Sequence, residues 1–300
     1  MAPPVDGDGG WRWATDTLAP MAWLEFEDPG PLTDPALVVS FDGWVNAGNA
    51  GTAAAEHLMS DAPIVGRFEA DALFDYRAVR PTVVFDEGVM SEVEFPEVVV
   101  AHRSAGDRDL LVVTGIEPNW NWQRLGREIA TLAATLGVVE YISLGGIPWA
   151  IPHTRSTSII ETATQRAFLA EDADYPAGAL RAPGSVMSVI EWFVAAQGIP
   201  TRGFWARVPH YVGATYWPAA VALVDRVSGH LGITPLYGML VDQAAEQRRR
   251  LDEILDDQPE IRAVVERLEA MNPDEAPSGE ELAAEIERFL QQQNEDPPGS

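Results

Sequence analysis

The stretch that decides the fold is residues 36–58, ALVVSFDGWVNAGNAGTAAAEHL. It begins with a continuous apolar run, typical of a strand buried on both faces, breaks at Asp42 and Gly43, and resumes after Asn49 as an alanine-rich helix. Asn49 is the predicted N-cap, and the small residues that follow it recur at helical spacing, so the helix can lie close against a sheet. The stretch therefore predicts a strand-turn-helix unit of an α/β protein.

The rest of the chain alternates apolar runs with helical patterns in the same way. Two runs, 97–101 and 109–114, are joined by a short polar loop and predict a hairpin, so the sheet is expected to be mixed. Residues 71–94 have no clean period, and we interpret them as a long functional or oligomer-facing excursion. The other predicted strands are 21–26 at an edge, 64–68, 138–144 (closed by a glycine turn at 145–148) and 203–208; the predicted helices are 120–136, 158–169, 185–193 and 218–231.

Composition divides the chain into four parts. Residues 1–20 indicate an extended segment rich in proline, glycine and aspartate, and residues 21–233 form the α/β core. Residues 234–290 are typical of an acidic helical extension, and 291–300 of a disordered tail. Residues 251–300 hold 15 acidic residues and 3 arginines, a net −12 of the chain's −26, so the charge is concentrated in this extension.

The same composition excludes several classes of function. A net charge of −26 argues against nucleic-acid partners and against anionic membrane surfaces, because both require a cationic surface. The sequence has no lysine and no cysteine, which excludes a phosphate-loop or Schiff-base lysine, a thiolate nucleophile and a disulfide. No apolar run is long enough to span a bilayer and no targeting segment is apparent, so we expect a cytoplasmic protein.

Motifs for cofactors and metals are missing as well. The chain has neither the G-x-G-x-x-G pattern of dinucleotide sites nor the G-x-S-x-G pattern of serine hydrolases. Its five histidines are scattered, and none forms the i, i+4 pair of a helical zinc site. We therefore expect no cofactor and no metal, and we assign no catalytic residue.

Polar residues after the first long strand form one part of a candidate site. Asp42, Gly43 and Asn46 could hydrogen-bond a ribose, a phosphate-like anion or a peptide. Alternatively, the Asp and Asn turn the chain and cap the helix, while the glycine permits a close approach. Glu117, which follows the strand at 109–114, either caps the helix predicted at Trp120 or offers a carboxylate.

Two further polar clusters follow later strands. His153, Thr154 and Arg155 place an imidazole, a hydroxyl and a guanidinium where they could bind an anion or transfer protons; alternatively they form a helix-entry cap and an intersubunit salt bridge. His210 and Tyr211 have the same placement and the same alternatives. Since strand ends converge in this fold class, these clusters together predict a candidate ligand-binding cleft.

Six short motifs resemble those of one protein family. In this order and spacing, between residues 36 and 231, they resemble the actinobacterial branch of the proteasome assembly chaperone 2 family. The resemblance implies a fold like that of purine nucleoside phosphorylases and assembly into homo-oligomers, often trimers. It also implies proteasome-related protein partners, with no enzyme activity firmly attached to the family. The motifs are residues 41–50 (FDGWVNAGNA), Arg80-Pro81, Glu117-Pro118, Pro152-His153-Thr154-Arg155, Pro183-Gly184-Ser185 and Pro209-His210-Tyr211.

One departure from the family pattern bears on function. The family's loop usually reads Gly-Trp-Asn-Asp-Ala-Gly, whereas this chain has Val45 and Asn46, so an amide replaces the carboxylate best suited to act as a base. We therefore expect a three-layer α/β/α protein that acts without catalysis, as a chaperone-like homo-oligomer, with a trimer favoured. The alternative is a small-molecule-binding protein or an enzyme resembling nucleoside phosphorylases or hydrolases, using the predicted cleft.

Overall fold

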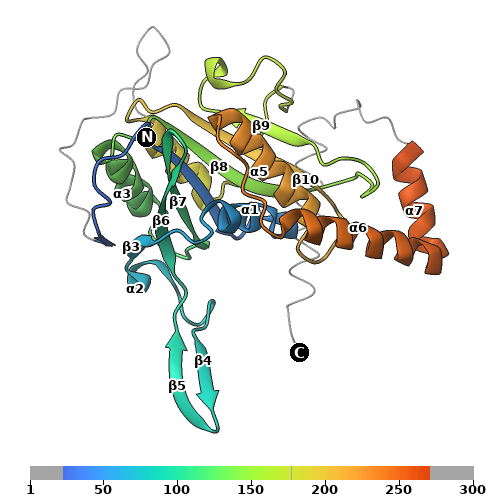
Figure 1. Ribbon diagram of the computed structural model, residues 1–300, viewed down its shortest axis with the longest axis horizontal. Helices are drawn as coiled ribbons and strands as arrows, with labels where there is room; N and C mark the ends of the chain where they lie inside the picture. The colour runs from blue at the N-terminus through green and yellow to red at the C-terminus, as the bar shows by residue number, and fades with distance from the viewer. Residues whose placement is uncertain (1–22, 177, 271–300) are drawn as a thin grey trace.

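The computed structural model describes residues 23–176 and 178–270 (Figure 1). The segment expected at residues 1–20 and the tail expected at 291–300 lie outside the described residues, as does the end of the predicted helical extension.

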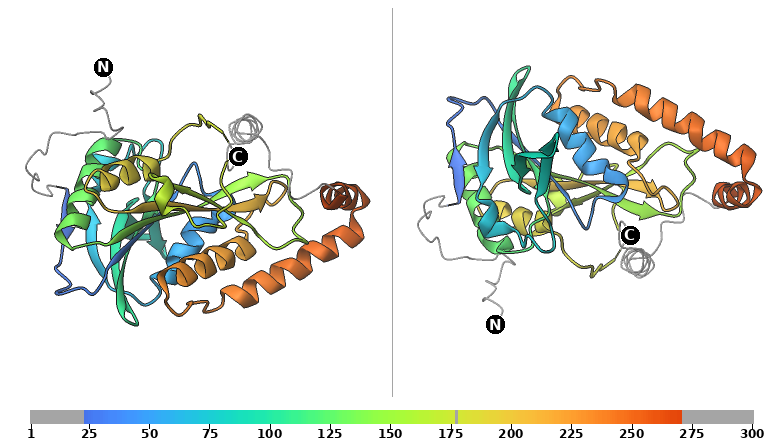
Figure 2. Two further views of the ribbon diagram at one scale, coloured as in Figure 1. Left: turned by 90° about the horizontal axis from the view of Figure 1, so that it is seen from above. Right: turned by 90° about the horizontal axis from the view of Figure 1, so that it is seen from below.

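A mixed sheet of eight strands forms the middle layer of the molecule (Figures 1 and 2). Its order is β1-β3-β6-β7-β2-β8-β10-β9. The four neighbours β7, β2, β8 and β10 run parallel, and the strands at either side of them pair antiparallel. The strands are β1 (Leu24–Phe26), β2 (Ala36–Asp42), β3 (Ile64–Phe68), β6 (Val98–Ala105), β7 (Arg108–Ile116), β8 (Glu140–Trp149), β9 (Ile159–Ala163) and β10 (Thr201–Pro209).

Helices cover both faces of this sheet. One face carries α3 (Trp122–Thr135) and α4 (Val186–Ala195), and the other carries α1 (Ala50–Leu58) and α5 (Trp217–Leu231), as Figure 2 shows. Beyond α5 lie α6 (Leu240–Asp257), which packs along it, and α7 (Pro259–Ala270). The predicted three-layer α/β/α fold with a mixed sheet and a C-terminal helical extension is confirmed.

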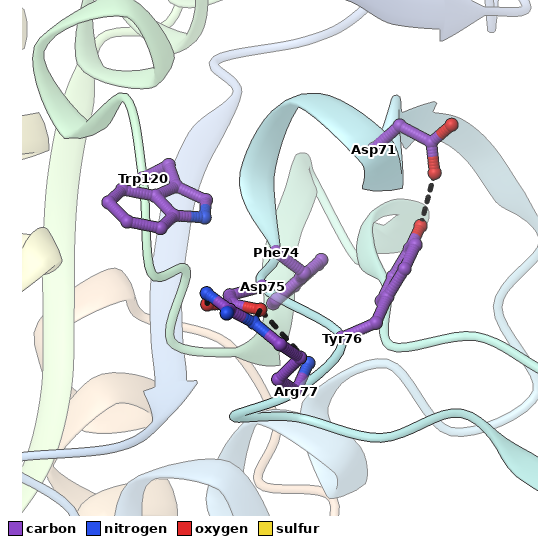
Figure 3. A pocket seen from close by; sticks show the side chains of 6 residues that line it. All are labelled: Asp71, Phe74, Asp75, Tyr76, Arg77 and Trp120. Carbon is purple, nitrogen blue, oxygen red and sulfur yellow. Dashed lines mark hydrogen bonds and ion pairs between the residues drawn. The ribbon is translucent and has the colours of Figure 1, made fainter.

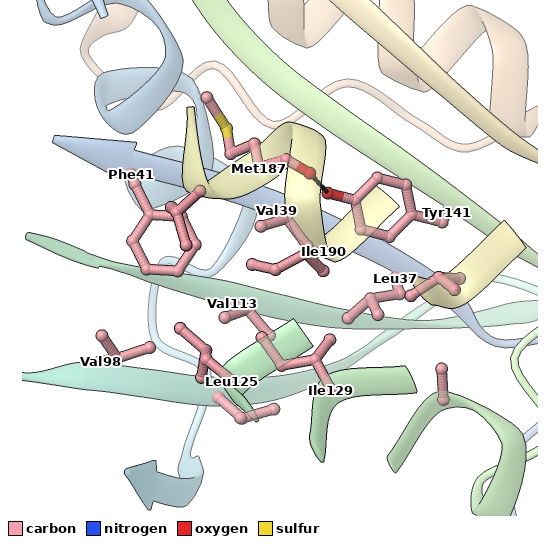
Figure 4. Packing of buried hydrophobic residues seen from close by; sticks show 14 of the residues in the cluster. Leu37, Val39, Phe41, Val98, Val113, Leu125, Ile129, Tyr141, Met187 and Ile190 are labelled. Carbon is pink, nitrogen blue, oxygen red and sulfur yellow. Dashed lines mark hydrogen bonds between the residues drawn. The ribbon is translucent and has the colours of Figure 1, made fainter. Parts of the chain in front are cut away.

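β2 connects the two hydrophobic cores. Leu37, Val39 and Phe41 point to the core under α3 and α4 (Figure 4). Val38 belongs to the core under α1 and α5. All four side chains are at most 1% exposed. A strand with apolar residues on both faces is stable only between two helical layers. The continuous apolar run therefore correctly predicted that β2 lies in the interior of the sheet, buried on both faces.

The glycine turn expected at residues 145–148 is wrong, because β8 runs through it to Trp149. Gly145 and Gly146 are strand residues over which the chain that follows β2 passes in close contact. A Cβ atom would lie 2.4 Å from the carbonyl oxygen of Val45 at position 145, and 2.3 Å from that of Ala47 at position 146. The two glycines therefore permit a close backbone approach rather than a turn.

The helix predicted at residues 158–169 is also wrong. Its first half is β9, which pairs antiparallel with β10, and a 3₁₀ turn, Arg166–Phe168, follows. Ile159, Ile160 and Thr162 are β-branched and fit a strand better than a helix. These residues form a strand because β10 has a free edge with which they can pair, and the local spacing of the sequence does not show this pairing.

A projecting hairpin accounts for most of residues 71–94. After the short helix α2 (Ala70–Leu73), strands β4 (Thr82–Asp86) and β5 (Val89–Glu94) pair with each other in a separate two-stranded sheet, hereafter the ribbon. Glu87 and Gly88 join them with φ angles of 46° and 84°, the two positive values that a tight hairpin turn requires. Figure 1 shows the ribbon extending away from the sheet and its helices.

One carboxyl group is largely, though not fully, covered where α4 packs on the sheet. Glu191 lies near Tyr141, whose hydroxyl donates a hydrogen bond to the carbonyl of Met187 (3.2 Å). Burial raises the pKa of Glu191 to about 7, and a hydrogen bond with Thr201 opposes this shift only in part. The unfolded chain ionises this carboxyl near its ordinary pKa of 4.5, so the folded state loses stability as the pH rises from about 4.5 to about 7.

Glu191→Gln removes this penalty without changing the shape of the side chain. We expect the variant to be more stable than the wild type at pH 8 by on the order of 2 kcal/mol, and to match it near pH 4.5. Urea unfolding at the two pH values measures the difference. Glu56→Gln, at an exposed site on α1, is the control and is expected to have no effect. A Glu191→Gln difference that is the same at both pH values would contradict the assignment.

Candidate functional site

Asn46 caps the helix that follows β2. Its side-chain oxygen accepts the backbone N–H groups of Gly51 (3.0 Å) and Thr52 (3.3 Å), and its nitrogen donates to the Thr52 hydroxyl (2.8 Å) and to Asp42 (3.3 Å). The predicted cap, Asn49, has a left-handed φ of 48° and instead donates to the hydroxyl of Thr215. The 3₁₀ turn Ala47–Asn49 lies between Asn46 and α1, so the side chain that caps the first turn of α1 comes from Asn46, upstream of the predicted position. At 6% exposure, the Asn46 amide is occupied by the chain itself.

Glu117 joins three segments that are distant in the sequence. One carboxylate oxygen accepts the backbone N–H of Trp44 (3.0 Å) and the other accepts that of Val186 (2.8 Å), the first residue of α4. Glu117 therefore caps a helix, as one of its two interpretations held, but the helix is α4 rather than α3. A carboxylate at a helix N-terminus also interacts favourably with the helix dipole. Gly43 is required here, because a Cβ atom would lie 2.4 Å from the Cβ of Glu117.

His153 and Tyr211 form a second group, after β8 and β10. The backbone N–H of His153 donates to the Tyr211 hydroxyl (2.7 Å), and Nδ1 of the ring lies 2.7 Å from the same oxygen. Its other nitrogen, Nε2, faces Asp252 of α6 at 3.3 Å. His210 packs edge-on against the Tyr211 ring, with Nδ1 3.3 Å from the carbonyl of Trp149. Burial lowers the pKa of His153 and raises the pKa of Tyr211.

Thr154 and Arg155 contact the C-terminal helices. The Thr154 hydroxyl donates to the Glu269 carboxylate, and Arg155 donates to the Glu269 carbonyl (2.6 Å). Arg248 of α6 donates to the carbonyl of Thr154 (2.9 Å). A mainly apolar cavity of about 180 Å³ lies between this loop and the helices, lined by His153, Tyr211, Leu251, Ile254, Leu255 and Val264.

The structure thus divides the nine predicted residues into separate groups. Asp42, Gly43, Asn46 and Glu117 surround the start of α1 and α4, while His153 and Tyr211 lie against α6. His210 is exposed and packs on the Tyr211 ring. Thr154 and Arg155 reach α7. The hydrogen bonds of each group go to one another, to helices, or to the backbone of Trp44 and Trp149, so these polar residues hold structural elements in place.

A hollow that the sequence did not single out as a site lies beside α2. It measures about 470 Å³, and Figure 3 shows the exposed Trp120 on one side of it and Arg77 paired with Asp75 (3.0 Å) on another. This pairing lowers the pKa of Asp75, and a hydrogen bond to Asp71 raises that of Tyr76 to about 12. The sequence signal for this hollow is the alternation of aromatic and charged residues over 74–77.

Two searches of the described residues bear on other kinds of site. Within residues 23–176 and 178–270, no group of three or more His, Asp or Glu side chains is arranged to hold a metal ion. Among the helices of that same part of the chain, none has the length and the apolar character needed to cross a membrane.

Glu117→Gln tests the double capping role. A Gln side chain offers only one acceptor oxygen, so either the Trp44 or the Val186 N–H loses its partner, and we expect the free energy of unfolding to fall by roughly 1–2 kcal/mol. Urea unfolding at neutral pH measures the loss. The control is Asp107→Asn, in the exposed turn between β6 and β7, which is expected to change little. Equal values for the two variants would show that Glu117 holds nothing in place.

Comparison with known proteins identifies the family. The model of the PAC2 family matches residues 40–255. A Mycobacterium tuberculosis protein of unknown function is 30% identical, with a TM-score of 0.79 over 90% of this chain and 96% of that chain. A proteasome-assembly chaperone homologue from the same organism is 28% identical, with a TM-score of 0.71 over 77% of this chain and 99% of that chain.

A more distant likeness concerns the fold alone. An archaeal proteasome activator from Pyrococcus furiosus is 17% identical, with a TM-score of 0.60 over 77% of this chain and 97% of that chain. No curated protein matches the sequence. The family match over most of the chain confirms the resemblance carried by the short motifs, and the chain belongs to the PAC2 family.

Proposed function

We propose that this protein is a cytoplasmic, non-enzymatic chaperone-like protein that acts through protein–protein contacts, with proteasome subunits or core particles as its partner class. One observation carries the proposal. The polar side chains at the strand ends, where an enzyme of this fold would place its chemistry, hold helices and loops, whereas apolar side chains are turned outward on the ribbon.

The family supports the partner class. The Mycobacterium tuberculosis relative is described as a proteasome-assembly chaperone homologue, and it shares 28% of its residues with this chain over almost its full length. The amide of Asn46 is consistent with a non-catalytic role, because both of its hydrogen-bonding atoms serve the start of α1 and the adjoining loop.

The ribbon supports assembly into homo-oligomers. The register pairs Val83 with Val93 and Phe85 with Met90, which places these four side chains on one face. They are 40%, 39%, 60% and 58% exposed, respectively. A two-stranded ribbon is marginal in water by itself, and an exposed apolar face of this kind marks a contact surface.

The direction of the ribbon bears on the form of the assembly. The ribbon extends away from the sheet and helices of its own chain (Figure 1). In a contact between two copies, the ribbon of one copy would therefore pack on the body of the next copy. Head-to-tail contacts of this kind close into a ring where the rotation between neighbours closes, and otherwise form an open filament. We therefore propose a cyclic homo-oligomer, with a trimer favoured.

Phe85→Ser combined with Met90→Ser tests the apolar face. We expect the double variant to lose the oligomer and to have the mass of a single chain by size-exclusion chromatography with light scattering. Val84→Ser with Val89→Ser, on the opposite face of the same ribbon, is the matched control and should keep the wild-type mass. An unchanged mass for the first variant would remove the ribbon from the interface.

Binding to proteasome subunits tests the partner class. Because the chain has no lysine, amine coupling attaches it through its α-amino group alone, which leaves every side chain free for a partner. We expect purified proteasome α-subunits of the source organism to bind the immobilised protein, and an equally acidic unrelated protein not to bind. No binding of either subunits or assembled core particles would contradict the proposal.

The cavity beside His153 favours the second candidate function, a small-molecule-binding protein or enzyme. Its apolar lining with an imidazole and a phenol at one side suits a small, partly apolar ligand. A thermal-shift screen with nucleosides, phosphate and short peptides tests it, because a ligand at 100 times its Kd adds about 2.7 kcal/mol of stability. Stabilisation by a nucleoside, together with its turnover, would replace the chaperone proposal.

A further inference from the structure

The outer part of the C-terminal extension is held to the body by hydrogen bonds to one loop and by the packing of Leu251 against the core under α1 and α5. The start of α6 is anchored independently, because Leu240 is fully buried and Gln247 bonds the N–H of Trp217 (2.9 Å) and the carbonyl of Thr215 (2.6 Å). From Arg248 onward the polar contacts to the body go to residues 152–155, hereafter the latch loop. Within this loop, Thr154 and Arg155 bond through exposed groups, whereas His153 is buried.

The contacts of His153 select its neutral form. The Tyr211 hydroxyl accepts the backbone N–H of His153, so its own proton is directed at Nδ1 of the ring, 2.7 Å away. Nδ1 is then an acceptor and Nε2 carries the proton that faces Asp252. A proton added at Nδ1 would meet the hydroxyl proton of Tyr211 and break this arrangement.

Four titratable or charged groups face the imidazole from the neighbouring elements. Asp252 of α6 and Glu269 of α7 favour the charged ring, whereas Arg248 of α6 and burial beneath the helix oppose it, and Tyr211 supplies the hydroxyl. The Asp252 side chain is 53% exposed, so solvent weakens its attraction, while the His153 side chain is 1% exposed. Burial is the largest effect, and the pKa of His153 is lowered.

We propose that His153 is an acid-sensitive latch, which holds the outer half of α6 together with α7 on the body at neutral pH and releases them when the imidazole takes up a proton. Release would separate the helices from the apolar cavity and uncover Leu251 and Leu255, which are partly buried, beside Ile254 and Val264, which are already 39% and 36% exposed. Acidification would therefore enlarge the apolar face that these helices present.

The direction of the effect follows from linkage. In the released state His153 is solvated and has its ordinary pKa near 6.5, whereas in the closed state its pKa is lower. The closed state is thus fully favoured above pH 6.5, and it loses stability as the pH falls from 6.5 toward the lowered pKa. Central elements such as α5 carry no such dependence on His153.

Hydrogen exchange of the full chain between pH 7.5 and pH 5.5 measures the opening. After correction for the intrinsic rate, we expect the opening constant of peptides from residues 248–270 to rise roughly threefold or more, with α5 as the internal reference. His153→Gln, which cannot be protonated, should remove this rise. His57→Gln, on α1, is the matched control and should keep it.

If His153→Gln folds poorly, a second variant and a second measurement test the latch independently. Tyr211→Phe removes the hydroxyl that occupies Nδ1, so the pKa of His153 in the closed state should move back toward its ordinary value and the rise in the opening constant on acidification should shrink. Because the chain has no cysteine, Glu56→Cys with Ala263→Cys provides one dye pair between the body and α7, whose energy transfer should fall on acidification. An opening constant of the wild type that does not change with pH, or an unchanged pH dependence in either variant, would overturn the latch.

Discussion

The structure depends on the close passage of one loop over one strand. The chain after β2 lies directly on β8, where the N–H of Gly146 bonds the carbonyl of Val45 (3.0 Å) and Asn46 continues the parallel pairing opposite Gly146. A Cβ at Gly51 would lie 2.5 Å from the carbonyl of Leu144, so α1 is in contact with the same strand. This approach places Asn46 on the first turn of α1. Only glycine permits backbones to meet so closely.

The same constraint explains why the backbone amides after β2 are not open to a ligand. The crossing loop occupies the region where an α/β sheet commonly exposes helix N-termini to a ligand. Here Asn46 satisfies the N-terminal amides of α1, and Glu117 satisfies the first amide of α4. Fully satisfied amides of this kind stabilise the fold and leave no free donor for a bound anion at these positions.

The sequence predicted those parts of the fold whose signals are local. The apolar run of β2, the small-residue face of α1 and the Ser185 cap of α4 each lie within a few residues of the structure they determine. β9 was missed because its partner, β10, lies some 40 residues away, and because the spacing of a run as short as residues 159–163 does not by itself distinguish a strand from a helix. The ribbon was missed because Glu87-Gly88 is a weak turn signal.

The candidate site shows the same limit at the level of single side chains. The residue types were informative, since Glu117 and His153 do occupy special positions. The sequence did not reveal which residues they bond. Glu117 bonds Val186, 69 residues further along, and His153 bonds Asp252, 99 residues further along. No spacing rule links such pairs. What the sequence supplied was the list of polar groups that needed partners, and the tertiary structure supplied the partners.

The ribbon has a consequence for how this architecture can diversify. Its strands pair with each other and not with the main sheet, and its turn closes on two residues. Both edges of the main sheet, by contrast, are short antiparallel strands, β1 with three residues and β9 with five, which offer little backbone to an incoming chain. The ribbon is thereby separated from the folding of the body: substitutions on it would alter the contact surface proposed above while the eight-stranded sheet and its two cores stay the same.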